Sequence, residues 1–350
     1  MTNLPPRIAS LATAVPPHIL ERDFVAAESK RIFSRFGDDF ERMASVFYTT
    51  GIDRRYSVCP VDWFETASNW RDRAERFLEG AKDLFRRAAG VALQQAGVTA
   101  QEIDAIVTVS STGIATPSVE SHVMHEMGFR DDVLRVPVFG LGCAGGVTGL
   151  AVASQLVHGG ARPRKVLLVI IELCTLHFRP DEMSKSNIVA TALFGDGAAA
   201  LVISADGDGP IIEHTGQHTW NNTLDIMGWR VDDEGLGAIF ARSIPDLVLT
   251  DLRPAADMFL ARHELSAAGI DHFSFHPGGT KVVQALETIF AMPEGQLADE
   301  RAILKGYGNM SAPTVMFVLE QAFKQPAKGR RFVGSLGPGF TASFATLVHE

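Results

Sequence analysis

Three polar side chains of this sequence lie in glycine-rich frames and are of the types that nucleophilic catalysis requires: Cys143, His276 and Asn309. Cys143 lies in Gly-Leu-Gly-Cys-Ala-Gly-Gly, between an apolar segment and a run of small residues. This pattern predicts a strand that turns into a helix, with the sulfur at the helix N-terminus, where unpaired N–H groups favour an anion. Such a setting lowers the pKa of a thiol, and the thiolate is the nucleophile. The alternative is a buried structural cysteine in a tight turn.

His276 follows Phe-Ser-Phe and precedes Pro-Gly-Gly, which predicts the end of a strand and the start of a helix. At such a turn an imidazole can act as a base or a hydrogen-bond donor near pH 7. Asn309, in Gly-Tyr-Gly-Asn-Met-Ser-Ala-Pro, is either the N-cap of a helix or an amide donor to an oxyanion. Each residue taken alone has a structural alternative. Because all three fall at junctions that line the crevice of an α/β sheet, we interpret them as one site.

The elements that would position these residues alternate between strands and helices. Apolar and β-branched runs predict buried strands, and periodic runs that end at glycine predict helices. We expect strands at 7–16, 105–112 and 165–173, a helix at 64–97, a helix–turn–strand unit at 184–206, a strand and glycine turn at 272–279, helices at 280–290 and 309–323, and two closing strands within 331–348. This alternation indicates a layered α/β fold.

Residues 193–203 and 335–348 share one pattern, a Gly-x-Gly turn followed by a strand of small and apolar residues. Such an internal similarity indicates a duplicated half-domain. No low-complexity linker separates the halves. We therefore expect two halves packed as one body, residues 1–206 carrying the cysteine and residues 207–350 carrying the histidine and the asparagine.

Composition narrows the class of protein. The 350 residues carry a net charge of −9, whereas a nucleic-acid-binding surface needs clustered basic residues, so we expect no nucleic-acid partner. A few local cations can still bind an anionic substrate. Cys59, Cys143 and Cys174 show no CxxC spacing, so we expect neither a disulfide framework nor a metal site. The N-terminus has no signal-peptide pattern and no apolar run approaches roughly 18 residues, so we expect a cytoplasmic protein without a membrane span.

Five segments together resemble the type III polyketide synthases, the chalcone-synthase-like branch of the thiolase superfamily: GLGCAGG, FSFHPGG, GYGNMSAPT, LFGDGAAALVIS and SLGPGFTASF. The resemblance covers nearly the whole chain. It implies an α/β, thiolase-like five-layer αβαβα fold built from two duplicated halves, and a homodimer. It also implies that acyl-CoA and malonyl-CoA are free substrates and that no metal or redox cofactor is needed.

The resemblance gives each of the three residues a role. The family's cysteine is acylated by a starter acyl-CoA, which makes Cys143 the nucleophile. The family's histidine and asparagine bind the thioester carbonyl of malonyl-CoA. His276 and Asn309 would therefore stabilise the enolate left by decarboxylation, as two fixed donors to one oxyanion should. The resemblance further implies that His276 holds Cys143 as a thiolate.

The resemblance also assigns a substrate pocket. Phe194 matches an aromatic gate between the CoA tunnel and the growing chain, and Ser311 matches a position near the nucleophile. Ala238 replaces a second gating phenylalanine, and Trp229 replaces a glycine of the pocket floor. The expected pocket residues are Phe194, Cys174, His177, Ser311, Trp229, Ala238 and Thr116, and the candidate CoA-binding cations are Arg42, Arg54, Arg55 and Lys281.

We therefore expect an acyltransferase that loads a starter on Cys143, extends it with malonyl-CoA by decarboxylative Claisen condensation, and cyclises the product to an alkylpyrone or alkylresorcinol. Ala238 leaves room near the gate and favours a medium or long fatty acyl starter. One alternative is a malonyl-primed polyhydroxynaphthalene-type synthase. Another is a β-ketoacyl-carrier-protein synthase III, whose His-Gln-Ala-Asn context this chain lacks. A silent acyl-binding protein on the same scaffold would not need the thiol.

Overall fold

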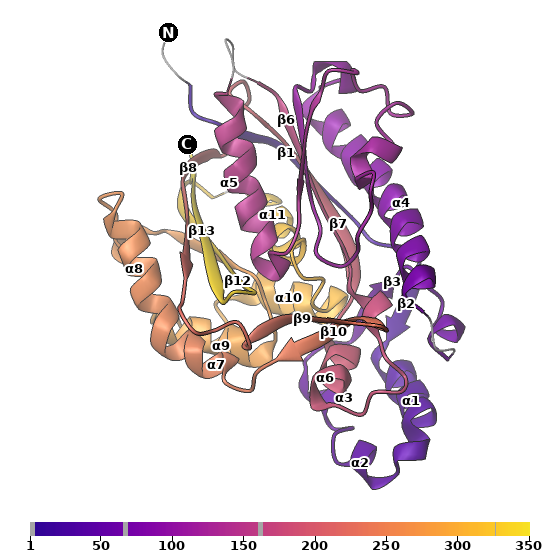
Figure 1. Ribbon diagram of the computed structural model, residues 1–350. Coiled ribbons are helices and arrows are strands. Elements are labelled where there is room, and N and C mark those ends of the chain that lie inside the picture. The colour runs from indigo at the N-terminus through magenta and orange to yellow at the C-terminus, as the bar shows by residue number, and fades with distance from the viewer. Residues whose placement is uncertain (1–3, 66–68, 160–163, 326) are drawn as a thin grey trace.

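The computed structural model describes residues 4–65, 69–159, 164–325 and 327–350 (Figure 1). Its main strands are β1 (Arg7–Ala14), β4 (Ala105–Val109), β5 (Leu134–Val138), β6 (Val166–Leu173), β7 (Asp196–Ser204), β8 (Ile211–Thr219), β11 (His272–Phe275), β12 (Gly329–Gly337) and β13 (Thr341–His349). They form one mixed sheet in the order β11-β12-β13-β8-β1-β7-β6-β4-β5. Two separate hairpins pair β2 (His18–Glu21) with β3 (Arg54–Ser57), and β9 (Met227–Asp232) with β10 (Gly235–Phe240).

The sheet consists of two groups of strands with the same topology. In the first group β4 runs parallel to β6, and β7 is antiparallel to both β6 and β1. In the second group β11 runs parallel to β12, and β13 is antiparallel to both β12 and β8. The groups meet edge to edge where Arg7 pairs with Ile211. The two segments of similar sequence, 193–203 and 335–348, contain the equivalent strands β7 and β13, as a duplication predicts.

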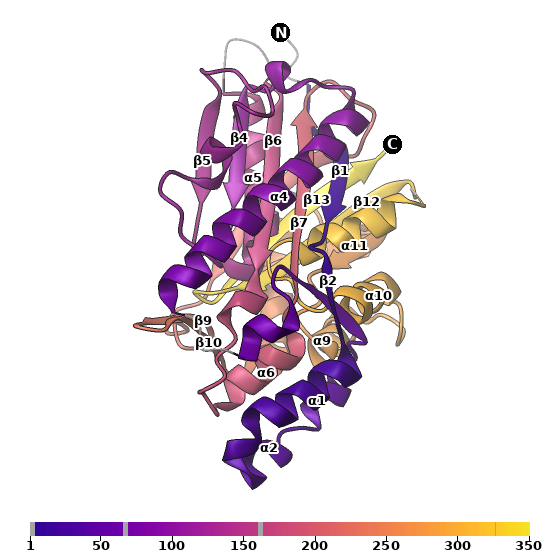
Figure 2. The same ribbon diagram turned by 90° about the vertical axis from the view of Figure 1, so that its right-hand side faces the viewer.

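Helices cover both faces of these strand groups. The α-helices are α1 (Arg22–Ile32), α2 (Asp38–Glu41), α3 (Val46–Thr49), α4 (Trp70–Ala96), α5 (Gly145–Val157), α6 (Lys185–Leu193), α7 (Ile244–Leu247), α8 (Arg253–Ala261), α9 (Thr280–Ile289), α10 (Ala298–Tyr307) and α11 (Thr314–Phe323). Figure 2 shows α4 lying across the outer face of the first group, where it packs on β1, β6 and β7. Helices α5 and α11 fill the space between the two groups. Helices α8 and α9 cover the second group, which completes five layers.

Two predicted helices begin later in the structure than in the sequence analysis. Helix α4 begins at Trp70 instead of residue 64, because Asn69 is its N-cap and accepts a hydrogen bond from the Asp72 N–H. Residues 61–65 form a separate 3-10 turn, and residues 66–68 lie outside the described chain. The predicted end of α4 is confirmed, since Gly97 adopts the left-handed conformation that stops a helix. Helix α11 begins at Thr314 instead of residue 309.

One end of the sheet gathers the segments that could form a site. Both views place α1, α2, α6 and α9 at the end opposite the chain termini (Figures 1 and 2). Two short 3-10 turns lie there as well, η5 (Gly142–Ala144) after β5 and η6 (Cys174–His177) after β6. Strand β11 also ends there, immediately before His276. None of the helices among the described residues is both long enough and apolar enough to cross a membrane.

Candidate active site

Cys143 lies in η5, which leads directly into α5. The turn depends on Gly142, which has φ +48° and on which a Cβ atom would lie 2.6 Å from Pro338 Cδ. Gly146 lets α5 approach the segment before α11, since a Cβ there would lie 2.4 Å from Ala312 O. The prediction that Cys143 lies at a helix N-terminus, between a strand and small residues, is confirmed.

The thiol of Cys143 is almost fully enclosed. The residue is 7% exposed, and its Sγ donates to Asn309 Oδ1 over 4.0 Å. Burial raises the pKa of the thiol to about 12, and hydrogen bonds with Ser311 and Asn309 offset only part of that shift. The predicted lowering of this pKa is therefore wrong, because desolvation of a thiolate outweighs the helix N-terminus. A buried thiolate here needs a positive charge beside it.

His276 follows β11, and its N–H donates to Gly334 O at 2.9 Å. That bond fixes the main chain against β12. Neither ring nitrogen has a hydrogen-bond partner among the described residues, although the residue is only 5% exposed. Burial lowers the pKa of the imidazole to about 3, so the ring is neutral near pH 7. A buried imidazole with two open nitrogens can accept a proton at one and donate a hydrogen bond from the other.

Asn309 lies between α10 and α11 and is not an N-cap, because Pro313 precedes the first residue of α11. Its main chain forms a parallel bridge with Phe194. Its side-chain Oδ1 accepts from Ser311 N–H at 2.8 Å, and Nδ2 donates to Gly278 O at 3.3 Å. These bonds fix the amide plane. They leave the second Nδ2–H for a ligand, as an oxyanion donor requires.

Cys143, His276 and Asn309 line one cavity of about 1010 Å³. The structure thus brings together three residues from three separate elements, two of them in the second half of the chain. The charged residues that line this cavity, within the described chain, are all cations: Arg42, Lys185, Arg242 and Lys281. The remaining lining is largely apolar. In a protein of net charge −9, this distribution favours a ligand with an anionic part and an apolar part.

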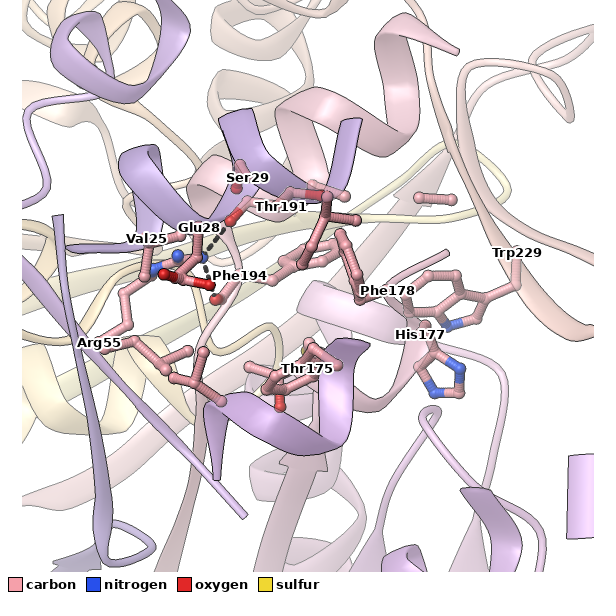
Figure 3. Close-up of a pocket in the computed structure, with 17 residues that line it drawn as sticks. Val25, Glu28, Ser29, Arg55, Thr175, His177, Phe178, Thr191, Phe194 and Trp229 are labelled. Carbon is pink, nitrogen blue, oxygen red and sulfur yellow. Dashed lines mark hydrogen bonds between the residues drawn. The ribbon is translucent and has the colours of Figure 1, made fainter. Parts of the chain in front are cut away.

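A second, smaller cavity of about 60 Å³ adjoins α6, and Thr191 of that helix lines it (Figure 3). Five predicted pocket residues line it: Phe194, Cys174, His177, Trp229 and Ala238. The ring of Phe194 lies 5.5 Å from that of Phe240, which lines the larger cavity, and 5.8 Å from that of Trp229. Aromatic rings therefore separate the two spaces. The structure groups these pocket residues with one another, but in a space adjoining the one that holds the three reactive side chains.

The polar members of the smaller cavity are poor candidates for chemistry. Burial raises the pKa of Cys174 well above its usual value. Burial also lowers the pKa of His177 to about 3, and its Nε2 lies 2.7 Å from Thr112 O. The expectation that Cys174 and His177 shape the pocket is consistent with these surroundings. Ser311 lies apart from this group, beside Cys143, and has φ +59°.

Three predicted site residues do not lie where the sequence analysis placed them. Thr116 is exposed and lines neither cavity of this chain. Arg55 is 4% exposed, and its Nη1 donates to the main-chain oxygens of Thr191 and Phe194 at 2.6 and 2.7 Å, so it supports the main chain at the end of α6 and does not line the larger cavity. Arg54 is exposed and does not line the larger cavity. Arg42 and Lys281, the other two candidate cations, do.

Sequence reasoning did not assign Lys185, Arg242 or Phe240 to the site, although all three line the larger cavity. It also missed Glu172, although a carboxylate inside the apolar run 165–173 was a visible signal. Glu172 Oε2 accepts from Thr112 Oγ1 at 2.7 Å and from Ser111 N–H at 2.9 Å, and burial raises the pKa of this carboxyl to about 8. Ser111 Oγ in turn accepts from Gly142 N–H at 2.9 Å, which links Glu172 to the turn that carries Cys143.

Known proteins provide an independent comparison. Residues 8–207 match the family model for the N-terminal domain of chalcone and stilbene synthases, and residues 212–346 match that for the C-terminal domain. A putative chalcone synthase of Bacillus subtilis (strain 168) is 34% identical, over 98% of this chain and 98% of its own length. A 1,3,6,8-tetrahydroxynaphthalene synthase of Streptomyces peucetius subsp. caesius is also 34% identical, over 97% of this chain and 92% of its own.

The fold was compared with solved structures as well. The crystal structure of 1,3,6,8-tetrahydroxynaphthalene synthase from Streptomyces coelicolor A3(2), a bacterial type III polyketide synthase, superposes with a TM-score of 0.92 at 25% sequence identity. The superposition covers 98% of this chain and 99% of that one.

Proposed function

Since the chain belongs to the chalcone and stilbene synthase family and is a type III polyketide synthase with a thiolase-like fold, we propose that it loads an acyl-CoA on Cys143 and extends it with malonyl-CoA. One observation carries this proposal. A thiol, an imidazole with two open nitrogens and a fixed amide line the same cavity, whose charged lining residues in the described chain are cations. CoA thioesters combine phosphates with an apolar acyl arm, which is the ligand chemistry that this lining favours.

The first step is acyl transfer to the thiol. Burial keeps both Cys143 and His276 neutral near pH 7, so His276 accepts the thiol proton as the sulfur attacks the thioester carbonyl. The resulting imidazolium stabilises the thiolate character of the sulfur, which burial alone disfavours. A new C–S bond forms to Cys143, the C–S bond to CoA breaks, and the departing CoA sulfur takes the proton.

The second step is decarboxylative condensation. The thioester oxygen of malonyl-CoA accepts hydrogen bonds from His276 and from the open Nδ2–H of Asn309. Loss of CO₂ leaves an enolate whose charge lies on that oxygen, and two donors held in place before the reaction stabilise it. The enolate carbon then attacks the acyl carbonyl on Cys143 and expels the cysteine sulfur. This sequence uses CoA thioesters as substrates and requires no metal or redox cofactor.

We assign the starter to medium or long fatty acyl-CoA and the product to an alkylpyrone or alkylresorcinol. Apolar side chains extend the larger cavity into the core of the second half, among them Leu252, Leu286 and Phe344. Met227 and Phe240 continue this wall on the β9–β10 hairpin. An apolar arm of this kind favours an alkyl chain, because each buried methylene contributes about 0.8 kcal/mol.

A malonyl-primed synthase is the second candidate function. Its support lies in the relatives, because 1,3,6,8-tetrahydroxynaphthalene synthases of two Streptomyces species resemble this chain over nearly its whole length. In that reaction malonyl-CoA serves as starter and extender, so the product does not change when other acyl-CoAs are added.

Mass spectrometry of products from purified enzyme, malonyl-CoA and acyl-CoAs of graded length distinguishes the candidates. Pyrones or resorcinols whose mass follows the starter support the fatty acyl assignment. A single product independent of the added starter supports malonyl priming. Product that forms only with an acyl-carrier protein overturns both. Radiolabelled acyl-CoA should label wild type covalently and leave Cys143→Ala unlabelled; no label on either protein contradicts the nucleophile assignment.

We also propose that two copies of the chain form a homodimer through the β5 edge of the sheet. β5 is the last strand in the sheet order, and large apolar side chains near it are exposed: Leu134 at 43%, Phe139 at 56% and Ile114 at 57%. Exposed apolar residues clustered at a sheet edge are typical of an interface. Sedimentation equilibrium should give a dimer for wild type and a monomer for Phe139→Glu; a monomeric wild type contradicts this assignment.

A further inference from the structure

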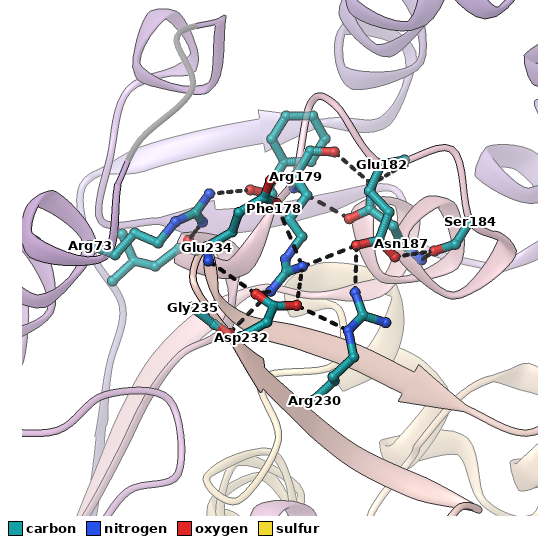
Figure 4. Close-up of polar contacts among 11 residues, drawn as sticks. Arg73, Phe178, Arg179, Glu182, Ser184, Asn187, Arg230, Asp232, Glu234 and Gly235 are labelled. Carbon is teal, nitrogen blue, oxygen red and sulfur yellow. Dashed lines mark hydrogen bonds and ion pairs between the residues drawn. The ribbon is translucent and has the colours of Figure 1, made fainter.

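A buried guanidinium joins the segments that wall the two cavities. Arg179 lies in the loop between η6 and α6 and is 4% exposed (Figure 4). It lines neither the larger nor the smaller cavity. The cost of burying a charge is high unless hydrogen bonds satisfy it, so its partners show which contacts it maintains.

The strongest contacts of Arg179 are with the β9–β10 hairpin. Its Nη1 and Nη2 donate to the two carboxylate oxygens of Asp232 at 2.9 and 2.7 Å, in a bidentate arrangement. Nη2 also donates to Gly235 O at 3.1 Å. The hairpin makes room for this group at Gly237, where a Cβ atom would lie 2.9 Å from Arg179 Cζ. The guanidinium therefore lies directly against the backbone of β10.

A second set of contacts ties Arg179 to the start of α6. Asn187 Nδ2 donates to Arg179 O at 2.7 Å, and Arg179 N–H donates to Asn187 Oδ1 at 3.3 Å. Nη1 of Arg179 donates to Glu182 Oε2 at 3.2 Å, and Arg230 of β9 donates to the same oxygen at 3.0 Å. The hairpin and the entry to α6 thus share one charged network.

Each segment in this network carries residues of the cavity walls. Turn η6 carries Cys174 and His177, and α6 leads into Phe194. In the hairpin, Trp229 pairs with Ala238 across the strands beside the smaller cavity, and Met227 pairs with Phe240 beside the larger one. The ring of Trp229 lies 4.8 Å from that of His177 and 5.8 Å from that of Phe194. Fixing the hairpin therefore fixes these aromatic contacts.

We propose that Arg179 is a positioning residue that holds the β9–β10 hairpin against His177 and Phe194 and thereby sets which acyl chains the enzyme accepts. Arg179 touches no reacting atom. It acts through Phe240, which lines the larger cavity assigned to the acyl chain, and through Trp229 and Ala238, which line the smaller cavity beside it. This inference rests on the proposed condensation at Cys143 but not on the identity of the starter.

Asp232→Asn is the variant that tests this role, because it removes the charge from the bidentate partner at a side chain that is 33% exposed, so folding should be retained. Asp233→Asn is the matched control: the next residue of the same turn, with the same charge change, and with no contact to Arg179 among those described. Gly237→Ala is an independent second variant, because the added Cβ displaces the same guanidinium from the other side.

Two readouts separate positioning from general stability. The first is the ratio of kcat/KM for a long and a short acyl-CoA, measured beside the rate of malonyl-CoA decarboxylation. We expect Asp232→Asn and Gly237→Ala to change that ratio about tenfold, as one misplaced methylene does in an apolar pocket, with decarboxylation within about twofold of wild type. The effects should not add in the double variant, because both act on one contact. The second readout is hydrogen exchange of residues 227–240, which should become faster in both variants but not in Asp233→Asn.

An unchanged ratio in Asp232→Asn and Gly237→Ala, even with a lower melting temperature, overturns the proposal, and so does unchanged exchange in the hairpin. If wild type accepts no added acyl-CoA, the fatty acyl starter is wrong. In that case hydrogen exchange of the hairpin decides the role of Arg179 by itself.

Discussion

The main chains of Phe194 and Asn309 form a short parallel bridge that joins the two halves of the chain. Asn309 N–H donates to Leu193 O at 2.9 Å, and Gly195 N–H donates to Asn309 O at 3.0 Å. Phe194 and Asn309 are therefore held together by main-chain hydrogen bonds. These bonds do not involve the Asn309 side chain, so a substitution of that side chain leaves the bridge in place.

That geometry gives the first prediction. Asn309→Ala and His276→Gln should each slow malonyl-CoA decarboxylation by about 10²-fold or more, because the first removes one donor from the enolate oxygen and the second replaces the fixed imidazole donor with a flexible amide. Release of CO₂ from purified protein measures the effect. Asn309→Asp, which retains shape but replaces the donating amide with a carboxylate, should be at least as slow as Asn309→Ala. Near-normal decarboxylation in both His276→Gln and Asn309→Ala contradicts their assignment.

The ionisation of Cys143 gives the second prediction. Burial raises the pKa of this thiol to about 12, so near neutral pH the thiolate forms only as a neighbouring base, the neutral imidazole of His276, takes up its proton. Iodoacetamide should alkylate wild type at pH 7 faster than it alkylates His276→Gln. In the variant the rate should rise about tenfold per pH unit up to at least pH 10 without a plateau, because the thiol stays protonated below its pKa. Identical pH profiles for the two proteins contradict a role of His276 in activating the thiol.

The cations of the larger cavity give the third prediction. Lys281→Ala, Arg242→Ala and Lys185→Ala should each raise the KM for malonyl-CoA several-fold and leave kcat nearly unchanged, if these cavity cations bind the nucleotide part of the substrate, as we propose, and not the reacting atoms. The matched control is the substrate malonyl-N-acetylcysteamine, which lacks the phosphates. Its KM should not respond to these variants. If the variants raise the KM for both thioesters equally, the cations do not act on the nucleotide part of the substrate.

Glu172 gives the fourth prediction. Its carboxyl has a pKa of about 8 in the folded chain, above the ordinary value of 4.5, because burial disfavours the carboxylate. Between those values the folded state binds more protons than the unfolded state, so this group stabilises the fold below pH 4.5 and loses that contribution as pH rises to 8. Glu172→Gln has nearly the same shape and no titration.

The free energy of unfolding of Glu172→Gln, relative to wild type, should therefore increase by roughly 3 kcal/mol between pH 5 and pH 8. Urea titrations of both proteins at several pH values measure this difference. A difference that does not change with pH means that Glu172 titrates normally in the folded chain.

Much of the fold and the centre of the site could be predicted from the sequence. The strand-to-helix junctions of Cys143 and His276 were readable because glycine permits the conformations that such turns require, as at Gly142 with φ +48°. The duplication was readable because equivalent strands keep equivalent apolar and small-residue patterns. The place of Asn309 in the site could be predicted from the sequence, but its conformation could not. Its backbone pairs with Phe194, which is distant in sequence, and does not begin a helix.

Features that depend on contacts between residues far apart in the sequence could not be predicted from the sequence. Arg55 resembled a surface cation, but the fold buries it, and main-chain oxygens around α6 become its partners. Lys185 and Arg242 belong to no motif, and only the fold brings them to the cavity of Cys143. The pKa of Cys143 depends on the depth of its burial, which local sequence does not determine. The division of the predicted pocket into two spaces depends on aromatic packing between α6 and the hairpin.

The duplicated architecture has a consequence for how the enzyme loses activity. The proposed nucleophile belongs to the first half and both proposed oxyanion donors belong to the second, while main-chain pairing joins the halves at Arg7 with Ile211 and at Phe194 with Asn309. The position of Cys143 relative to His276 and Asn309 thus depends on the packing between the two strand groups, where α5 and α11 lie, more than on the integrity of either half. A small shift of one half relative to the other would move His276 and Asn309 away from Cys143 and would leave every strand and helix intact. Condensation therefore depends on the contact between the two similar halves, and we expect warming to abolish activity before any secondary structure melts.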